Sequence, residues 1–541
     1  MRHQTGPPWD RLALPGLLVL AAVLRLQDLA TRGTWDADQG HDMLVLRTFV
    51  TEGVVPLLGP PTSIGDIHHG AWYYYLLSPA AALTGGDSPL AVVTLIALCG
   101  VAAVGVVWWL ARSIAGPVAG LVAGLVLAVS AAAVDESTFI WNPNLIALSS
   151  AIALAAAWRA SSSHDTWSSH DARSGHDARW WVVAAVGTAV TMQCHVLGIA
   201  LLPIVGVPFI LDARRRSLGR VPLAILLVFV AAYLPLVVNE LTRDFSELRA
   251  ALEFLASGGS PADVAIPVRF GIVALRVVSW PLTGLIIDGF AAGAVALVVV
   301  IAIVVWRWIG GREELDQRVA RWFGLGLLLA AVFLTLAAPS LASVVRGLPN
   351  DHYHAYADPM VVVLVGLGAA ALLREIRAPL GVIVAGVGVA TLLGWNLTHL
   401  PPAVNPDGGY PAAERAAARV DAALTKAGVA RDQAIHLRSV PEFKSTEALA
   451  YPLVLVGRRV LAETPDGLAP GSVAASGAPP PAADALVVLC DQLFREAIGA
   501  DCGGPAEAKV PAEAGEAAFT TVLDRFEAAP GRWVTIFAKP G

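Results

Sequence analysis

Charged residues are scarce in this chain of 541 residues. They make up 15% of it, whereas hydrophobic residues make up 56%, and the mean hydropathy is +0.64. A soluble protein of this length needs a larger share of charge to keep its surface hydrated. The composition therefore excludes an ordinary soluble protein and indicates that much of the surface faces lipid.

Lysine is missing from most of the chain. All the lysines, Lys426, Lys444, Lys509 and Lys539, follow the last long apolar run, which predicts a different, aqueous environment for the C-terminal part. The net charge of −6 is mild, and no basic stripe follows any expected helix. Nucleic acid is therefore excluded as a partner.

Cysteine is rare as well. Cys99 and Cys194 fall inside apolar runs, where a small buried thiol is ordinary. Cys490 and Cys502 lie close together in the polar tail, and outside the cytoplasm they could form a short-loop disulfide. Whether they pair depends on their geometry, so the sequence leaves the bonded and the free state open.

Long apolar runs, by contrast, are frequent. Each is about long enough to cross a bilayer as a helix, and we count about eleven of them. Arginines cluster on alternating connections, which the positive-inside rule makes cytoplasmic. The runs lie near 12–28, 88–111, 117–133, 144–158, 180–195, 197–211, 221–239, 288–309, 322–342, 359–373 and 380–397.

Two further segments need separate treatment. Segment 268–284 is apolar but contains Arg269 and Arg276, and we expect it to be interfacial or re-entrant, because a span there would put the following Arg cluster outside. Segment 161–178 repeats Ser-His-Asp or Gly-His-Asp. For that segment a flexible cytoplasmic linker is favoured over a metal-binding tract, since nothing apolar would fix the ligands.

The tail from 398 alternates a helical pattern at 412–428 with short apolar runs at 434–439, 453–457, 485–490 and 533–539. This alternation predicts a small α/β domain. An odd number of spans places it outside the cytoplasm. We therefore expect an α-helical polytopic membrane protein with a transmembrane domain at 1–397 and a soluble extracytoplasmic domain at 398–541.

Carboxylates gather in the first external connection, at Asp36, Asp38 and Asp42. Acidic side chains at a membrane surface are costly without water access or a purpose. The apolar residues from His41 to Val50 keep a helical spacing, so Asp38 would lie at a helix N-terminus that favours its ionised form. Asp38 is then suited to act as a general base, although a helix cap at Asp36 or Asp38 is the plain alternative.

Adjacent histidines, His68 and His69, come before Trp72 and Tyr73. The aromatic residues are typical of a membrane interface, but the histidines can also donate hydrogen bonds to a phosphate. A metal site is the rival interpretation. The other external histidines lie far away in the sequence and no ligand spacing links them, so we expect no metal.

The order of the first span, Asp38-Gln39, Gly53, His69-Gly70-Ala71-Trp72-Tyr73-Tyr74-Tyr75-Leu76-Leu77 and Gly85-Gly86 resembles the polyprenyl-phosphate-sugar-dependent glycosyltransferases of the GT-C superfamily. The chain is most similar to the protein O-mannosyltransferases and the aminoarabinose lipid A transferases within it. Asp38 matches the Asp of that family's Asp-Glu pair, whereas Gln39 departs from the Glu. The resemblance covers approximately residues 10–400 and leaves the tail unrecognised.

Two later loops add support to this resemblance. Trp141-Asn142-Pro143 is similar to the Trp-Asn-Pro of bacterial members, although a polar turn also explains it. Arg346, His352 and Tyr353 lie where relatives carry an aromatic and basic segment, and they could contact the lipid phosphate, with a capped turn as the alternative.

The resemblance implies a GT-C fold and transfer of a sugar, with inversion, from polyprenyl phosphate to a hydroxyl on a protein, lipid or polysaccharide acceptor outside the cytoplasm. Asp38 would take the proton, and no cofactor is implied. A lipid or sugar transporter or flippase, and a scaffold that presents the tail, are the alternatives; a transporter predicts charges at span centres or inverted repeats. The expected substrate-binding residues are Asp36, Gln39, Asp42, His68, His69, Trp72, Tyr73, Trp141, Asn142, Arg269, Arg346, His352 and Tyr353.

Overall fold

The structure is a computed structural model. Arg346, His352 and most of the His-rich segment 161–178 lie outside the residues that it describes. The described residues are 8–62, 67–162, 178–256, 264–284, 286–342, 353–442, 446–464, 467–468, 483–513 and 517–540.

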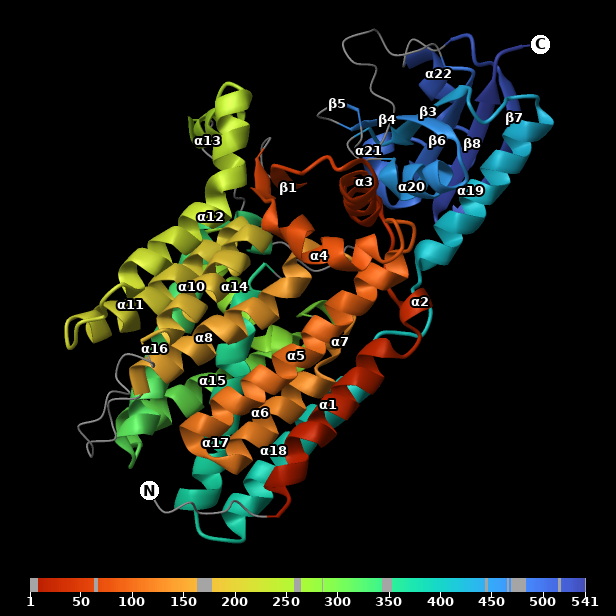
Figure 1. Cartoon of the computed structure of the whole chain (residues 1–541). Helices are drawn as coiled ribbons and strands as arrows, with labels where there is room; N and C mark the ends of the chain where they lie inside the picture. Colours follow the sequence, from red (N-terminus) through yellow and green to blue (C-terminus); the bar gives the residue numbers. More distant parts are fainter. Residues whose placement is uncertain are drawn as a thin grey trace.

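A bundle of long helices forms the larger part of the molecule, and a sheet-containing part lies at one end of it (Figure 1). Among the described residues, nine helices are long and apolar enough to cross a membrane. The eleven apolar runs correspond to eight of these long helices, to the two shorter apolar helices α6 and α10, and to α1. The eleven are α1 (Asp10–Leu26), α5 (Pro89–Ala115), α6 (Pro117–Val129), α8 (Ile146–Ser162), α10 (Trp180–Cys194), α11 (Leu201–Ala213), α12 (Val221–Thr242), α15 (Ile286–Gly310), α16 (Glu314–Ala337), α17 (Asp358–Glu375) and α18 (Leu380–Thr398).

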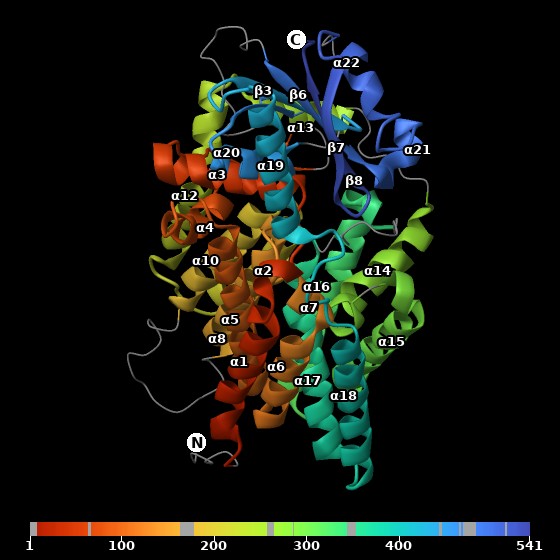
Figure 2. The same ribbon diagram turned by 90° about the vertical axis from the view of Figure 1, so that its right-hand side faces the viewer.

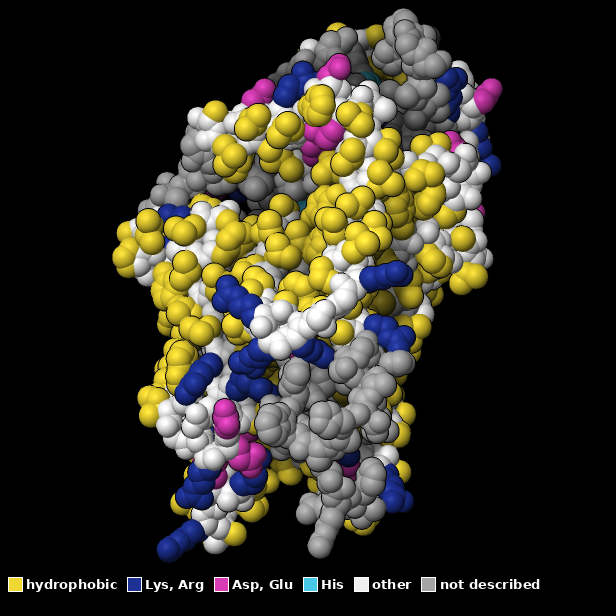
Figure 3. Space-filling view, turned by 60° about the vertical axis from the view of Figure 1, so that its left-hand side comes forward, with side chains coloured by type: hydrophobic (Ala, Val, Ile, Leu, Met, Phe, Trp, Pro, Cys, Tyr) yellow, Lys and Arg dark blue, Asp and Glu magenta, His cyan; other side chains and the backbone are white. Residues whose placement is uncertain are grey.

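One end of the bundle, which we call the Arg-rich end, holds buried ion pairs. Arg307 lies 3.0 Å from Asp316 and 2.8 Å from Glu375, and Arg374 lies 2.5 Å from Asp316. Helix α1 begins at the same end (Figures 1 and 2). Hydrophobic side chains cover the body of the bundle above it, and Arg side chains gather below them (Figure 3). We call the opposite end, which carries the sheet, the distal end.

The ninth long apolar helix, α14 (Ile266–Thr283), has both of its ends near the distal end. Arg269 Nη1 donates to Thr335 O, close to the end of α16, at 3.0 Å. Trp395, close to the end of α18, donates its indole N–H to Thr283 O at 2.9 Å. The helix therefore does not run from one end of the bundle to the other, as expected for an interfacial segment, and α15 returns to the Arg-rich end.

Short elements cover the distal end between the long helices. The first external connection holds a helix, α3, that begins at Ala37, so Asp38 lies at its N-terminal end as predicted. These short elements are α2 (Leu29–Arg32), α3 (Ala37–Glu52), β1 (Leu58–Pro61), β2 (His68–Gly70), α4 (Trp72–Ala82), α7 (Ala131–Asp135), η1 (Asn142–Leu145), η2 (Val196–Ala200), α13 (Ser246–Ala256), η3 (Pro339–Ala342) and η4 (Ala355–Ala357).

The C-terminal part folds as an α/β unit around a six-stranded sheet of order β5-β4-β3-β6-β8-β7. Strand β3 is parallel to β4 and β6, whereas β8 is antiparallel to β6 and β7. Its elements are α19 (Gly409–Lys426), β3 (Ala434–Val440), α20 (Glu447–Leu455), β4 (Arg459–Thr464), β5 (Gly467–Leu468), β6 (Ala485–Asp491), η5 (Gln492–Phe494), α21 (Arg495–Ile498), η6 (Glu507–Lys509), α22 (Val510–Glu513), β7 (Thr521–Ala529) and β8 (Arg532–Ala538).

Two features of this unit answer questions that the sequence raised. The apolar run at 453–457 ends a helix, α20, instead of forming a strand, because a connection between the parallel strands β3 and β4 must cross over. Cys490 and Cys502 form a disulfide. The predicted fold class, a polytopic helical protein with a small C-terminal α/β part, is confirmed.

Candidate active site

The N-terminus of α3 presents one exposed carboxylate. Asp36 is the N-cap, and it forms a capping box with Gln39, whose side-chain oxygen accepts from the Asp36 N–H at 2.7 Å. This arrangement satisfies backbone N–H groups that the first turn of a helix leaves open. Gln39 also donates to Ile140 O at 2.9 Å. Asp36 is thus the cap, while Asp38, in the first turn, is exposed.

Asp42 lies one turn further along α3 and is buried, with 1% of its surface exposed. It accepts hydrogen bonds from Tyr73 at 2.6 Å and from Tyr74 at 2.8 Å. Burial raises the pKa of Asp42 to about 7, although the charge of His41 and the two tyrosine hydroxyls oppose the shift. The three side chains fasten α4 to α3.

The C-terminal unit packs directly on α3 (Figure 1). His41 Nδ1 lies 2.8 Å from Glu447 Oε1 on α20. A Cβ on Gly40 would lie 2.1 Å from Glu447 O, so only glycine permits this approach. Burial lowers the pKa of His41, but the Glu447 carboxylate and those of Asp42 and Asp38 outweigh it and raise the pKa to about 9.

Residues just before α3 also form hydrogen bonds with the C-terminal unit. Trp35 donates its indole N–H to Ala448 O at 2.9 Å, and its carbonyl accepts from Arg532 at 2.7 Å. Thr34 donates to Asp407. The connection that carries Asp38 is therefore fixed by residues almost 400 or more positions later in the chain.

His68 and His69 have different surroundings. The backbone N–H of His68 donates to Glu247 of α13 at 2.7 Å, and its ring Nδ1 lies 2.9 Å from the same carboxylate. Burial raises the pKa of Glu247, but its bonds to His68 outweigh that effect and the net shift is downward. His69 is buried, and burial, with the charge of His68, lowers its pKa to about 3.

His69 belongs to a column of rings at the break between α10 and α11. Its ring lies 4.4 Å from that of His195, which stacks on Tyr353 at 4.2 Å; Trp141 lies 5.9 Å from Tyr353. The break exposes backbone groups, and side chains satisfy them: His69 Nδ1 accepts from Val196 N at 3.3 Å.

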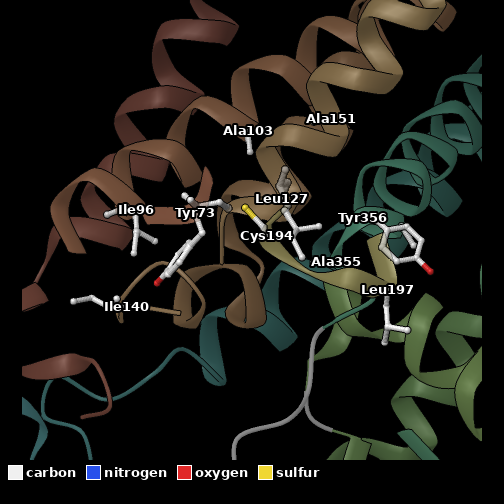
Figure 4. Close-up of a cluster of buried hydrophobic side chains, with 14 of the residues drawn as sticks. Tyr73, Ile96, Ala103, Leu127, Ile140, Ala151, Cys194, Leu197, Ala355 and Tyr356 are labelled. Carbon is white, nitrogen blue, oxygen red and sulfur yellow. The ribbon is translucent and has the colours of Figure 1, made fainter. Parts of the chain in front are cut away.

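His195 and Asn142 also bond backbone groups at the break between α10 and α11. His195 Nδ1 accepts from Leu197 N at 3.1 Å, and Asn142 donates to Cys194 O at 2.5 Å. Because Nδ1 accepts in both histidines, each neutral ring carries its proton on Nε2 and can donate there. Figure 4 shows Cys194 beside Tyr73, so the column adjoins α4.

Sequence reasoning missed His195 and Gln193. Gln193 accepts from the Trp72 N–H at 3.4 Å, and a Cβ on Gly70 would lie 2.1 Å from its side chain. The boundary between the apolar runs 180–195 and 197–211 could have pointed to them. A helix break leaves backbone groups without partners, and polar side chains at the break can bond them.

A second buried polar cluster was also missed. Trp280 donates to Glu136, whose pKa is raised by burial despite that bond. His354 packs edge-on against Trp280 at 5.7 Å. Arg269 is remote from the ring column in its contacts, since it donates to Thr335 O and Val264 O. The predicted residues that the structure describes thus fall on α3, β2 and α4, in the ring column and on α14.

Comparisons with known proteins agree with this architecture. Residues 68–238 match the family described as dolichyl-phosphate-mannose-protein mannosyltransferase. The structure of ArnT from Cupriavidus metallidurans bound to undecaprenyl phosphate is similar over 98% of each chain, with 17% identity and a TM-score of 0.53. The apo form of ArnT has 18% identity and a TM-score of 0.52, over 98% of this chain and 97% of ArnT.

The chain therefore shares the fold of ArnT, and residues 68–238 match the mannosyltransferase family. The expected resemblance is supported within this range by a glycosyltransferase family and over the whole chain by the fold. A comparison with curated protein sequences finds no match. The matched range 68–238 begins at β2 and includes the ring-column residues His69, Trp141 and His195.

Proposed function

We propose that this chain is a GT-C glycosyltransferase, which transfers a sugar from a polyprenyl-phosphate donor to an acceptor hydroxyl, with inversion, on the extracytoplasmic side. The acceptor is a protein, lipid or polysaccharide. The observation that carries the proposal is the position of Asp38. Its carboxylate is exposed in the first turn of α3, a helix at the distal end that is held in place by buried side chains.

The reaction needs a base and a site for the leaving phosphate. Asp38 accepts the proton of the acceptor hydroxyl while the hydroxyl oxygen bonds to the anomeric carbon. The bond from that carbon to the phosphate oxygen breaks, and the phosphate leaves with the electron pair. His69 and His195 can donate their Nε2–H groups to that oxygen, because both Nδ1 atoms accept backbone N–H groups.

The distribution of charge supports the proposed side of the membrane. Arg307, Arg374 and the start of α1 lie at the Arg-rich end, which the positive-inside rule makes cytoplasmic. The distal end with Asp38 and the C-terminal unit then lies outside. We divide the chain accordingly into a transmembrane catalytic domain, 1–397, and an extracytoplasmic domain, 398–541.

The test uses membranes that contain the full chain and a panel of radiolabelled polyprenyl-phosphate sugars. Asp38→Asn should lower transfer of label by roughly 100-fold or more at unchanged protein abundance, because a positioned base contributes that much. Glu52→Gln, an exposed acid on the same helix, is the matched control and should transfer normally. Equal transfer by Asp38→Asn would favour the transporter or scaffold instead.

A further inference from the structure

Exposed arginines gather at the Arg-rich end, where α8 ends, α10 begins and α11 ends. Figure 3 shows Arg side chains grouped below the hydrophobic side chains of the bundle. We define the arginine patch as the exposed arginines of these three helix ends and of the connection that follows α11. Its members are Arg159, Arg179, Arg214, Arg215 and Arg220.

Hydrogen bonds hold the three helix ends together. Arg216, just after α11, donates to Ala160 O of α8 at 2.9 Å. Trp181, in the first turn of α10, donates its indole N–H to Asp212 of α11 at 2.7 Å. Four of the patch residues lie within two positions of these bonded residues in the chain, so they share one surface.

Acids at this end of the bundle are paired with other arginines. Asp212 is buried and lies 2.7 Å from Arg216. Asp316 is also buried, and it lies 3.0 Å from Arg307 and 2.5 Å from Arg374. These pairs leave the arginine patch with a local excess of positive charge, which attracts anions.

Apolar side chains that face lipid adjoin the patch. Ile210 and Leu211 of α11 are 49% and 46% exposed. The backbone N–H of Arg214 donates to Ile210 O at 3.1 Å, so Arg214 follows one helical turn later on the same face. Arg159 lies 4.7 Å from the ring centre of Trp180, and indole rings are frequent at the level of lipid headgroups. The surface therefore changes from apolar to cationic at the membrane boundary.

A phospholipid has the same two parts in the same order, with acyl chains inside the membrane and a phosphate at its edge. Arginine suits the phosphate because its planar guanidinium can donate two parallel hydrogen bonds. The choline ammonium of a zwitterionic lipid cancels the phosphate charge, whereas an anionic lipid keeps it. Free phosphate would leave Ile210 and Leu211 uncovered. Charge and apolar surface together favour an anionic lipid.

We propose that the arginine patch binds the headgroup of an anionic phospholipid in the leaflet next to the Arg-rich end. The phosphate accepts from the guanidinium groups, and the acyl chains lie against the exposed face of α11. This binding does not depend on the proposed function, because it involves neither Asp38 nor the ring column.

Native mass spectrometry of the full chain, released from detergent micelles, tests the binding. The probes are dioleoylphosphatidylglycerol, dioleoylphosphatidylcholine and inorganic phosphate at equal concentrations. Wild-type protein should retain the anionic lipid about five-fold more than the zwitterionic one, since each arginine near a headgroup adds to the attraction. Arg159→Gln/Arg214→Gln/Arg215→Gln should retain the two lipids equally.

The matched control is Arg243→Gln/Arg249→Gln/Arg415→Gln, which removes the same charge from exposed positions at the distal end and should keep the wild-type preference. Arg214→Gln alone should reduce the preference about two-fold, which keeps the test available if the triple variant is unstable. The proposal is wrong if the wild type shows no preference, if the patch variants keep it, or if the control loses as much. Displacement of the lipid by an equal concentration of inorganic phosphate would also overturn it, because the patch would then bind free phosphate.

Discussion

His41 and Glu447, separated by more than 400 positions in the chain, lie 2.8 Å apart between α3 and α20. The pair joins the first external connection of the bundle to the C-terminal unit. Because Asp38 lies on the same helix as His41, the position of the proposed base depends on this junction.

The His41–Glu447 pair predicts a pH dependence of stability. The folded-state pKa of His41, about 9, exceeds its ordinary value of 6.5, so the stabilisation is full below pH 6.5 and disappears as pH rises through about 9. Glu447→Gln should lower stability on the order of 1–3 kcal/mol at about pH 6 and by little at about pH 10. Melting temperatures of both proteins across this range test it, and a pH-independent difference would contradict it.

Close packing at Gly40 predicts a steric effect. Gly40→Ala places a Cβ 2.1 Å from the backbone of Glu447, so α20 must move away from α3. Sugar transfer should fall by about ten-fold or more, because small displacements of catalytic groups are costly. Gly16→Ala in α1, where a Cβ meets nothing within 4 Å, should leave transfer and melting temperature nearly unchanged.

Substitution of the tyrosines around Asp42 should lower stability more at high pH than at low pH, the reverse of the trend expected for Glu447→Gln. Asp42 has a raised pKa, about 7, so folding loses stability as pH rises from its ordinary value towards 7 and above. Tyr73→Phe or Tyr74→Phe removes a donor to the carboxylate and should cost about 1–2 kcal/mol more at pH 8 than at pH 5. Thermal unfolding at the two pH values measures this, with Tyr75→Phe, whose hydroxyl donates to Pro56 O, as the control.

The pairing of His69 with His195 predicts that substitution of His195 weakens binding of a lipid phosphate but not of the matching alcohol. His195→Asn keeps an acceptor for the Leu197 N–H but removes the second ring from the column. Affinity for farnesyl phosphate should fall about ten-fold, the effect of one hydrogen bond to a charged group, while affinity for farnesol stays the same. Fluorescence titration measures both, and His399→Asn, a ring stacked on Trp395 elsewhere at the distal end, is the control.

If both ligands weaken equally, His195 only supports the helix break. If wild-type protein shows no preference for the phosphate over the alcohol, the proposed donor is contradicted.

Much of the fold follows from local patterns. Run lengths place the eleven helices, alternating arginines separate the two ends, and Arg269 with Arg276 marks α14 as different from its neighbours. The motif at Asp38-Gln39 also places the proposed base in the first turn of α3. Each of these inferences uses residues close together in sequence, where helix geometry fixes their relation.

The amino-acid sequence thus determined the membrane class, the two ends and the identity of the exposed acid. Only the tertiary structure decided that His195 joins His69, that Asp42 is enclosed by two tyrosines, and that Arg532 contacts Trp35 while Glu447 contacts Gly40, before and after Asp38 in the chain. The physical reason is that these contacts join segments from distant parts of the chain. Contacts of this kind depend on how the whole interior packs, so the spacing of residues within one segment does not predict them.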